Sequence, residues 1–507
     1  MNITEKSNIN RILEINRNNS KTAIIYKNYN FTFKELDQIA NQVSEKIAKL
    51  GKNLRIGLLC HNDHQFIISF FAILKAKCSV VLLNPKLHPR ELKKLCVEAD
   101  IECLITYKKI YVFLRENNFL NDEFSKQLTY ILFDSMETEP QVLGSEISKK
   151  NNIINSKKDE AVIVFTSGVT GSIKGVILTH QNFMSNMLIT YPILKCNSND
   201  VVLTVLPLYH VAALRFVLTH ILVGATTHLF HVTTIADFIN AYIDKNNITS
   251  LSANPFFLSI MLERQAGSSK YPMNCLKIIT SGGSTMSEKL RNQLLDQFPH
   301  IDFYSLYGLS EATSIVSILN PQQAKIKVNS VGKIIPNTAY KIVKNDKRNK
   351  FGELWLKGPG VMKGYLDACV KDVLNKNGWL RTGDLVSIDK NKDLTIIGRK
   401  KELINIAGYK ISPKEIESVI QKHQDVKEAV VIGKEMEPYG EVLVAIIEPM
   451  RKDLKEIDII KFCKEHLATF KIPKEIIITN KLYITQSGKI DKKKIKNFIK
   501  RRSIKIS

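Results

Sequence analysis

The feature that most constrains the fold of this chain is an alternation between short apolar runs and segments with helical periodicity. The apolar runs have the length of buried strands, and residues 33–50 between two of them have the 3.6-residue period of an amphipathic helix. Strands that alternate with helices are typical of parallel sheets with helices packed on their faces. The runs that we interpret as strands are residues 56–60, 79–83, 103–106, 161–166, 201–205 and 276–280.

The alternation restarts near the C-terminus. After Ile397, two segments are expected to be helices and two to be strands. The polar, glycine-led junction 398–402 suits a hinge. A chain of 507 residues also exceeds what one hydrophobic core organises. We therefore predict an α/β protein with a large N-terminal domain of parallel-rich sheets flanked by helices over residues 1–397, and a small mobile α+β domain over residues 398–507. The C-terminal helices are expected at residues 411–423 and 457–466, and the strands at 429–432 and 442–447.

The charge of the chain bears on its partners. A formal net charge of +24 would attract polyanions, but the basic residues are spread along the chain and form no stripe interleaved with aromatic residues. We therefore expect no nucleic-acid partner. Only residues 489–505 are densely basic, which leaves open a weak peripheral contact with an acidic membrane surface.

Targeting and redox signals favour a cytoplasmic protein. Residues 1–10 are polar and contain no apolar core of a signal peptide, and the apolar stretches 66–83 and 212–225 are each interrupted by charged or basic side chains. The 8 cysteines include no Cys-x-x-Cys pair, so neither a zinc cluster nor a disulfide framework is expected.

A glycine-rich segment follows one predicted strand directly. Its sequence, Thr-Ser-Gly-Val-Thr-Gly-Ser-Ile-Lys-Gly over residues 166–175, combines glycines that allow tight turns, hydroxyl groups and a mobile positive charge. This composition predicts a loop that holds phosphate groups. No Gly-Lys-Ser/Thr closes the segment, which disfavours a P-loop kinase or ATPase.

With this segment the chain resembles the adenylate-forming superfamily, which comprises acyl-CoA synthetases, adenylation domains and luciferases. Residues 31–35 and 72–76 are similar to the N-terminal part of that family. The resemblance covers nearly the whole chain, because further motifs follow in the order of the family. They are Pro207-Leu-Tyr-His210, Ser281-Gly-Gly-Ser284, Tyr307-Gly-Leu-Ser-Glu311, Gly352-Glu-Leu-Trp355, Gly378-Trp-Leu-Arg-Thr-Gly-Asp384, Gly398-Arg399 with Gly408-Tyr-Lys410, and Ser487-Gly-Lys489.

The resemblance implies a site for ATP and Mg²⁺. Activating a carboxylate at the α-phosphate of ATP requires neutralisation of several phosphates, and a carboxylate is a suitable ligand for magnesium. The implied phosphate ligands are Thr166, Ser167, Gly168, Thr170, Gly171, Lys174 and Ser310, with Glu311 and Thr166 at the magnesium ion. The implied nucleoside ligands are Gly282, Gly283 and Ser284 along adenine, Tyr307 on its face with Gly308 beside it, and Asp384 and Arg399 at the ribose.

The resemblance also implies how the C-terminal domain takes part. Lys489 is the implied catalytic residue, with its ammonium between the attacking carboxylate and the α-phosphate. Lys401 is the implied hinge residue, and Gly408 would admit the pantetheine arm of CoA. The chain departs from the family pattern at Tyr483 and Ile484, where proline and a basic residue are usual. Without the motif around it, Lys489 would be interpreted as an ordinary solvated lysine of a basic tail.

The expected substrate is a carboxylic acid with an apolar tail. His210 is implied to gate the acyl pocket beside the carboxylate, although the same residue could be a packed core histidine. The pocket segments 211–214, 253–257 and 307–309 are largely apolar and offer no aspartate for an ammonium group, which favours a fatty or aryl acid over an amino acid. We expect a fatty acid that is converted to acyl-AMP and then to the CoA thioester.

Three alternatives accompany this expectation. The acyl group could pass to the phosphopantetheine of an acyl carrier protein, and only the acceptor would differ. A luciferase-like oxygenase would need a special substrate. A non-catalytic adenylate-binding protein would be expected to have lost Glu311, Asp384 or Lys489, and all of these are present.

Overall fold

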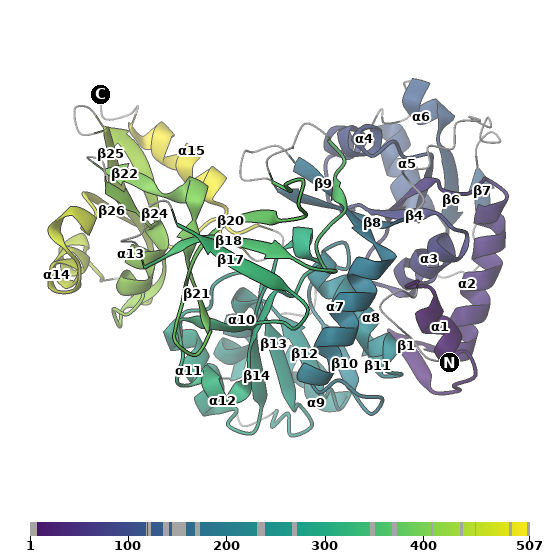
Figure 1. Ribbon diagram of the computed structural model, residues 1–507, viewed down its shortest axis with the longest axis horizontal. Coiled ribbons are helices and arrows are strands. Elements are labelled where there is room, and N and C mark those ends of the chain that lie inside the picture. Colours follow the sequence, from purple (N-terminus) through teal and green to yellow (C-terminus); the bar gives the residue numbers. More distant parts are fainter. Residues whose placement is uncertain are drawn as a thin grey trace.

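The computed structural model describes most of the chain (Figure 1). The predicted α/β class is confirmed, since parallel strands with helices on their faces form the bulk of the N-terminal part. The described residues are 8–117, 119, 123–134, 141–143, 159–167, 173–230, 239–265, 271–344, 350–367, 373–406, 409–436, 440–451, 453–485 and 489–503.

The largest sheet has a parallel centre and antiparallel flanks. Strands β10, β11, β12, β13 and β14 run parallel to one another, and antiparallel pairing begins where β15 joins β14. In spatial order the strands are β17 (Ala339–Val343), β18 (Gly352–Lys357), β20 (Leu380–Ile388), β21 (Leu394–Arg399), β16 (Ser330–Ile334), β15 (Ser317–Leu319), β14 (Asp302–Tyr307), β13 (Ile278–Ser281), β12 (Ser250–Ala253), β10 (Val201–Thr204), β11 (Thr226–His228), β1 (Thr22–Tyr26) and β2 (Tyr29–Thr32).

A second sheet contains the strand that precedes the glycine-rich segment. Its centre is parallel, and β9 returns antiparallel to β8 as a long hairpin. In spatial order the strands are β19 (Gly364–Tyr365), β9 (Ile173–Thr179), β8 (Glu160–Ser167), β4 (Ser79–Leu82), β3 (Arg55–Leu59), β5 (Cys103–Tyr107), β6 (Thr129–Phe133) and β7 (Gln141–Leu143).

The third sheet belongs to the C-terminal part of the chain. Its strands are β23 (Tyr409–Ile411), β22 (Ile404–Ile406), β25 (Gly440–Pro449) and β24 (Val426–Met436), with β26 (Glu475–Ile478) parallel to β25. Two clusters of buried side chains in this part are separate from those of the N-terminal sheets. The domain boundary between residues 397 and 398 remains a prediction.

Helices cover the sheets on both faces. Those of the N-terminal part are α1 (Arg11–Asn16), α2 (Phe33–Ala48), α3 (His64–Lys75), α4 (Pro89–Glu98), α5 (Lys108–Glu116), α6 (Glu123–Gln127), α7 (His180–Ile193), α8 (Val211–Leu222), α9 (Ile239–Lys245), α10 (Pro255–Gln265), α11 (Glu288–Gln297) and α12 (Pro321–Ala324). The C-terminal part contains α13 (Pro413–Ile420), α14 (Glu456–His466) and α15 (Lys492–Ser503). Short 3₁₀ turns are η3 (Ser310–Ala312), η4 (Lys400–Glu402) and η5 (Thr469–Lys471).

Local sequence explains where several of these helices begin and how they pack. Thr32 and Glu35 form a capping box at the start of α2, close to the predicted start of this helix. Asp63 caps α3 by accepting a hydrogen bond from the backbone N–H of Phe66. Helix α3 is apolar on nearly all sides because it lies between β1 of the first sheet and β3 and β4 of the second. Among the described residues, no helix has the length and apolar character needed to cross a membrane.

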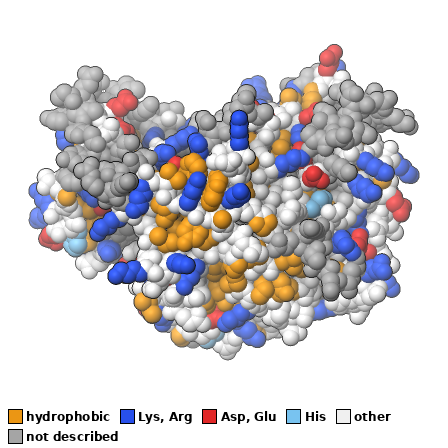
Figure 2. All heavy atoms as spheres, in the orientation of Figure 1, with side chains coloured by type: hydrophobic (Ala, Val, Ile, Leu, Met, Phe, Trp, Pro, Cys, Tyr) orange, Lys and Arg blue, Asp and Glu red, His pale blue; other side chains and the backbone are white. Residues whose placement is uncertain are grey.

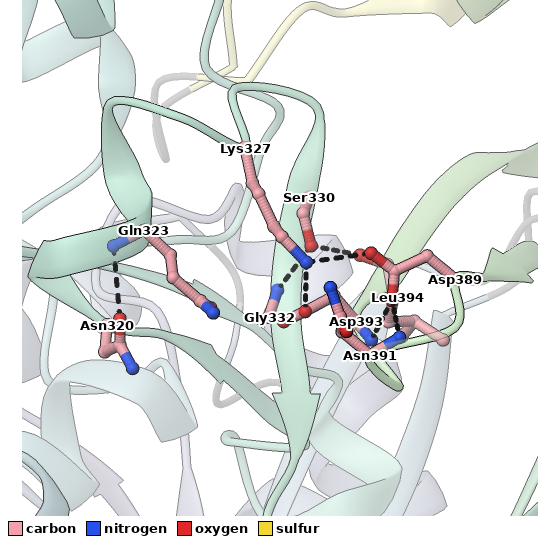
Figure 3. A network of polar contacts seen from close by, with 9 residues as sticks. All are labelled: Asn320, Gln323, Lys327, Ser330, Gly332, Asp389, Asn391, Asp393 and Leu394. Carbon is pink, nitrogen blue, oxygen red and sulfur yellow. Dashed lines mark hydrogen bonds and ion pairs between the residues drawn. The ribbon is translucent and has the colours of Figure 1, made fainter.

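Strands β20 and β21 are joined by a tight turn that is fixed by polar contacts (Figure 3). The Lys327 ammonium pairs with the carboxylate of Asp389 at 2.8 Å and also with that of Asp393. Ser330 donates a hydrogen bond to the carbonyl oxygen of Leu394 at 2.8 Å. These contacts hold the hairpin of β20 and β21 against the start of β16.

A patch of aromatic and basic side chains covers one face of β17 and β18. Figure 2 shows hydrophobic side chains crossed by Lys and Arg in this region. The Lys341 ammonium lies 4.4 Å from the ring centre of Trp355 and 4.5 Å from that of Trp379, and the Arg381 guanidinium lies 4.7 Å from the ring of Trp355. These are cation–π contacts.

Candidate active site

Several of the sequence-predicted site residues lie where parallel strands end. Strands β10, β12, β13 and β14 are neighbours in the first sheet, and the segments that contain His210, Asn254, Gly282 and Tyr307 lie at or just after their carboxyl ends. Because the carboxyl ends of parallel strands meet at one edge of a sheet, this edge is where an α/β fold binds its ligands.

Asp384 and Arg399 form an ion pair across a hairpin. They are direct partners in the register of β20 and β21, and Arg399 Nε lies 2.7 Å from Asp384 Oδ1. The Asp384 side chain is only 3% exposed, and burial raises the pKa of this carboxyl although the Arg399 charge opposes the shift. A buried, oriented carboxylate of this kind can accept hydrogen bonds from vicinal hydroxyl groups, as the predicted ribose contact requires.

Tyr307 connects this pair to the edge of the parallel strands. Its hydroxyl donates a hydrogen bond to Asp384 Oδ2 at 2.5 Å. Burial, and then the Asp384 charge, hold the pKa of Tyr307 well above its usual value, so the hydroxyl keeps its proton. The tyrosine is thereby fixed at both its backbone and its hydroxyl, which sets the orientation of the ring.

Glycines let the backbone come close to this ring. A Cβ at Gly282 would lie 2.8 Å from the carbonyl oxygen of Leu306, and Gly283 has a φ of +83°. Ser284 follows and is exposed. At Gly308 a Cβ would lie 1.3 Å from the carbonyl oxygen of Ser314, so only glycine fits.

Glu311 lies in the turn η3 that follows Gly308. Its Oε1 accepts a hydrogen bond from the Tyr365 hydroxyl at 2.7 Å, and the Lys174 ammonium lies 5.1 Å from the centre of the Tyr365 ring. Tyr365 thus places Glu311 beside the hairpin of β8 and β9. No cluster of three or more metal-binding side chains occurs in the described ranges. A single carboxylate is compatible with Mg²⁺, because this ion is usually held by one or two carboxylates together with substrate phosphates and water.

The glycine-rich segment is only partly described. Thr166 and Lys174 are paired across the hairpin of β8 and β9, and the Thr166 hydroxyl lies 3.5 Å from the Lys174 carbonyl oxygen. Ser167 ends β8. The predicted phosphate ligands Gly168, Thr170 and Gly171 lie outside the described residues, as does Gly408.

His210 lies at the N-terminus of α8, at the open end of β10. Burial, and then the charge of Lys489, lower the pKa of His210 to about 4, so the imidazole is neutral at pH 7. The preceding loop is held by Asn62, whose side chain donates to the Leu206 carbonyl oxygen at 2.9 Å and accepts from the Leu208 N–H at 2.8 Å.

Lys489 of the C-terminal part reaches the same edge. Its Cε lies 3.8 Å from the position that a Cβ would occupy on Gly283. Solvent still reaches the side chain, but the surrounding protein, and then the nearby Arg399 charge, lower the pKa of Lys489. The Lys489 ammonium is thus within electrostatic range of both His210 and Arg399, and its catalytic role remains a prediction.

Contacts between the two parts of the chain hold this arrangement. Lys414 of α13 donates to the Ile396 carbonyl oxygen at 2.9 Å, and Ser412 donates to that of Ile397 at 2.6 Å. Farther away, the Lys427 ammonium lies 3.2 Å from Glu263 of α10. The predicted hinge residue Lys401 lies in the exposed turn η4, between the last strand of the first sheet and the first strand of the third.

Sequence reasoning missed several residues of this site. They include Tyr365, Asn62 and Lys414, each of which donates a hydrogen bond to a residue more than 15 positions away in the chain. Asn62 lies two positions after an apolar run and could have been noticed as a polar residue at a strand end. Tyr365 and Lys414 have no comparable signal.

Both parts of the chain match models of known protein families. The model of the AMP-binding enzyme family matches residues 14–366, and the model of the AMP-binding enzyme C-terminal domain matches residues 415–489.

Characterised relatives match over nearly their whole length. An oxalate–CoA ligase from Arabidopsis thaliana is 30% identical, with 92% of this chain and 93% of that protein covered. A 2-succinylbenzoate–CoA ligase from Bacillus cytotoxicus is 29% identical over 94% of this chain and 96% of that protein. The 4-coumarate–CoA ligase 1 of Arabidopsis thaliana is 26% identical over 92% of this chain and 87% of that protein.

Solved structures have the same architecture. The o-succinylbenzoate CoA synthetase of Bacillus subtilis, in complex with its acyl-adenylate intermediate, superposes with a TM-score of 0.81 at 25% identity, covering 96% of this chain and 98% of that one. The same enzyme with ATP and a magnesium ion gives a TM-score of 0.80 at 25% identity, over 96% and 99% of the two chains. Because the family model spans residues 14–366 and the full-length relatives agree with it, the chain belongs to the AMP-binding enzyme family.

Proposed function

We propose that this protein joins an apolar carboxylic acid to the thiol of CoA at the expense of ATP, with an acyl-adenylate as intermediate. The observation that carries the proposal is the convergence of three charged groups: the Asp384–Arg399 ion pair lies within electrostatic range of Glu311, and Arg399 lies within range of Lys489. Lys489 in turn lies beside Gly283 at the end of β13. A carboxylate for ribose, a carboxylate for a phosphate-bound cation and a mobile ammonium are what adenylation needs at one place.

The chemistry proceeds in two steps. A carboxylate oxygen of the acid attacks the α-phosphorus of ATP, the bond between the α-phosphorus and the bridging oxygen breaks, and pyrophosphate leaves. The thiol sulfur of CoA, after loss of its proton, then attacks the acyl carbonyl and releases AMP. Lys489 stabilises the negative charge that develops in the first step, and neutral His210 lines the entrance for the acid. Mg²⁺, when bound at Glu311, neutralises the phosphate oxygens.

The class of acid is the finer part of the proposal. The segments beside His210 are apolar, and Val211, Ala213 and Leu214 are buried. The apolar character of this segment supports an acid with an apolar tail, either a fatty acid as expected from the sequence or an aryl acid. The aryl reading is supported by relatives that are named for 4-coumarate and 2-succinylbenzoate, while the oxalate–CoA ligase shows that relatives of similar identity differ in their acid.

The deciding experiment is ATP–pyrophosphate exchange with a panel of short, medium and long fatty acids, aryl acids and oxalate, each with and without CoA. Exchange that depends on an apolar acid, with formation of its CoA thioester, is the expected result. Exchange only with oxalate or with amino acids would contradict the apolar-acid proposal. Exchange without a CoA thioester would redirect the proposal to a carrier-protein acceptor.

Lys489→Ala tests the role of the lysine. We expect it to lower acyl-AMP formation at least about a hundredfold, as removal of a charge-stabilising group does, while thioester formation from preformed acyl-AMP and CoA stays within about threefold. Lys493→Ala, which removes an exposed lysine of α15, is the matched control. Equal loss of both half-reactions in Lys489→Ala would contradict the assignment.

A further inference from the structure

The two neighbours of the predicted hinge residue Lys401 each form an ion pair, and the two pairs connect them to different parts of the chain. On its N-terminal side, the Lys400 ammonium pairs with Glu353 of β18 at 2.8 Å. On its C-terminal side, the Glu402 carboxylate pairs with Lys492 of α15 at 2.7 Å. One neighbour of Lys401 is thus fastened to the first sheet, and the other is fastened to the C-terminal part of the chain.

Lys492 connects the hinge to two helices. As the first residue of α15 it also lies 3.7 Å from Glu417 Oε1 of α13. Glu417 is itself held, because its Oε1 accepts a hydrogen bond from the Val431 N–H at 2.9 Å. Although burial opposes it, the charges of Glu417 and Glu402 raise the pKa of Lys492, so the ammonium stays protonated at neutral pH.

Lys492 is also three positions after Lys489, at the end of a small hairpin. Ile484 and Ile490 form an antiparallel bridge. The Thr485 N–H donates to the Lys489 carbonyl oxygen at 2.6 Å, and the Lys489 N–H donates to the Thr485 hydroxyl at 3.1 Å. Backbone contacts therefore fix Lys489 relative to the start of α15, and Lys492 fixes the start of α15 relative to the hinge.

We propose that Lys492 is a positioning residue for adenylation, which aligns the Lys489 hairpin with the hinge through Glu402 and Glu417. The inference rests on the proposed function, because it assumes that Lys489 serves the first half-reaction. Lys492 binds neither the acid nor the nucleotide in this proposal and acts on adenylation through the hairpin.

The burial of these groups predicts which property will change. The Lys492 and Glu402 side chains are 34% and 38% exposed, and ion pairs at such sites contribute little to stability. Glu417, the second partner of Lys492, is only 15% exposed, so removal of the Lys492 charge costs more stability than removal of the Glu402 charge. A displacement of a catalytic group by about 1 Å can, in contrast, lower a rate by about a hundredfold. Loss of the contact is therefore expected to change adenylation much more than thermal stability.

The test compares half-reactions in matched variants. Lys492→Gln and Glu402→Gln each remove one member of the pair, and Lys492→Arg keeps the charge. Lys434→Gln is the control, because Lys434 pairs with Glu475 at 2.8 Å in the same C-terminal sheet with comparable exposures of 23% and 34%. ATP–pyrophosphate exchange reports adenylation, preformed acyl-AMP with CoA reports thioester formation, and the melting temperature reports folding.

We expect Lys492→Gln and Glu402→Gln to lower exchange by about tenfold to a hundredfold, with thioester formation close to that of the parent protein. The melting temperature should stay close to that of the parent in Glu402→Gln, which leaves the contact of Lys492 with Glu417 in place. Lys492→Arg should restore most of the exchange, and Lys434→Gln should leave it unchanged. Exchange within about twofold of the parent in both Gln variants, or an equal fall in both half-reactions, would overturn the inference. A parent protein that forms no acyl-AMP would instead reject the proposed function itself.

Discussion

Replacement of Gly308 by alanine is the sharpest test of the geometry of this site. The added Cβ would lie 1.3 Å from the carbonyl oxygen of Ser314, whereas ordinary contacts begin near 3.4 Å. The carbonyl oxygen would therefore have to move away by about 2 Å. The backbone at Ser314 is constrained, because its N–H donates a hydrogen bond to the Leu309 carbonyl oxygen and its φ of 83° lies in the left-handed region. The segment that must move contains Ser310 and Glu311, the predicted phosphate and magnesium ligands.

The expected effect follows from that displacement. Overpacking at a constrained position costs about 1–3 kcal/mol of stability, and misplacing a catalytic group by 1 Å or more lowers the rate by about a hundredfold. We expect Gly308→Ala to fold but to lose at least about a hundredfold in ATP–pyrophosphate exchange, measured beside its melting temperature. The control is Gly360→Ala, where the Cβ would meet its nearest neighbour, the Ala312 carbonyl oxygen, at an ordinary 3.5 Å.

The outcome that refutes this reasoning is a Gly308→Ala protein with exchange within about threefold of the parent. The loop from Gly308 to Ser314 would then be able to move without cost to catalysis, and the position of Glu311 would have no catalytic role. A similar loss in Gly360→Ala would also refute it, because any added methyl group near η3 would then be harmful.

Two further predictions concern stability. Burial lowers the pKa of His64 from the ordinary 6.5 to about 4 in the folded protein, so its contribution to stability is present above pH 6.5 and is lost as the pH falls from 6.5 to 4. In denaturant titrations, His64→Phe should therefore reduce the loss of unfolding free energy between pH 7 and pH 5 by about 2 kcal/mol. An unchanged loss would show that His64 does not resist protonation. Glu160→Gln should lower the free energy of unfolding by about 3–5 kcal/mol, because Arg55 binds Glu160 through two nitrogens at 2.9 and 3.0 Å and the two side chains are only 13% and 3% exposed. Asp302→Asn, which breaks an exposed pair with Lys195, should lower it by less than about 1 kcal/mol. Equal losses in the two variants would contradict the burial argument.

The sequence predicts elements better than it predicts their contacts. Helix α2 and the strands β3, β5 and β10 follow from local period and capping, which are properties of neighbouring residues. The placement of His210, Gly283 and Tyr307 at one edge follows from the rule for parallel strands. The pairing of Asp384 with Arg399 depends on the register of a hairpin. The resemblance implied only that both residues lie at the ribose, and periodicity does not give the register.

Other contacts could not be predicted from the sequence, for a physical reason. Tyr365 reaches Glu311, and Lys492 reaches Glu402, only because separate segments fold against each other. No local period or spacing encodes such a meeting, and each of these residues has an ordinary neighbourhood in the chain. The segments around Gly171 and Gly408 lie outside the described residues, so their predicted roles remain predictions.

The aromatic patch on β17 and β18 gives the molecule an intrinsic optical probe. The chain contains 2 tryptophans, and both ring systems stack against Lys341. Trp355 lies two positions from Glu353, the residue that holds the hinge neighbour Lys400. Tryptophan emission therefore arises wholly from one surface next to the hinge, where its colour and intensity respond to nearby charge and water. A rapid-mixing fluorescence trace with ATP, acid and then CoA therefore tests, without an attached dye, whether this surface changes as the protein turns over.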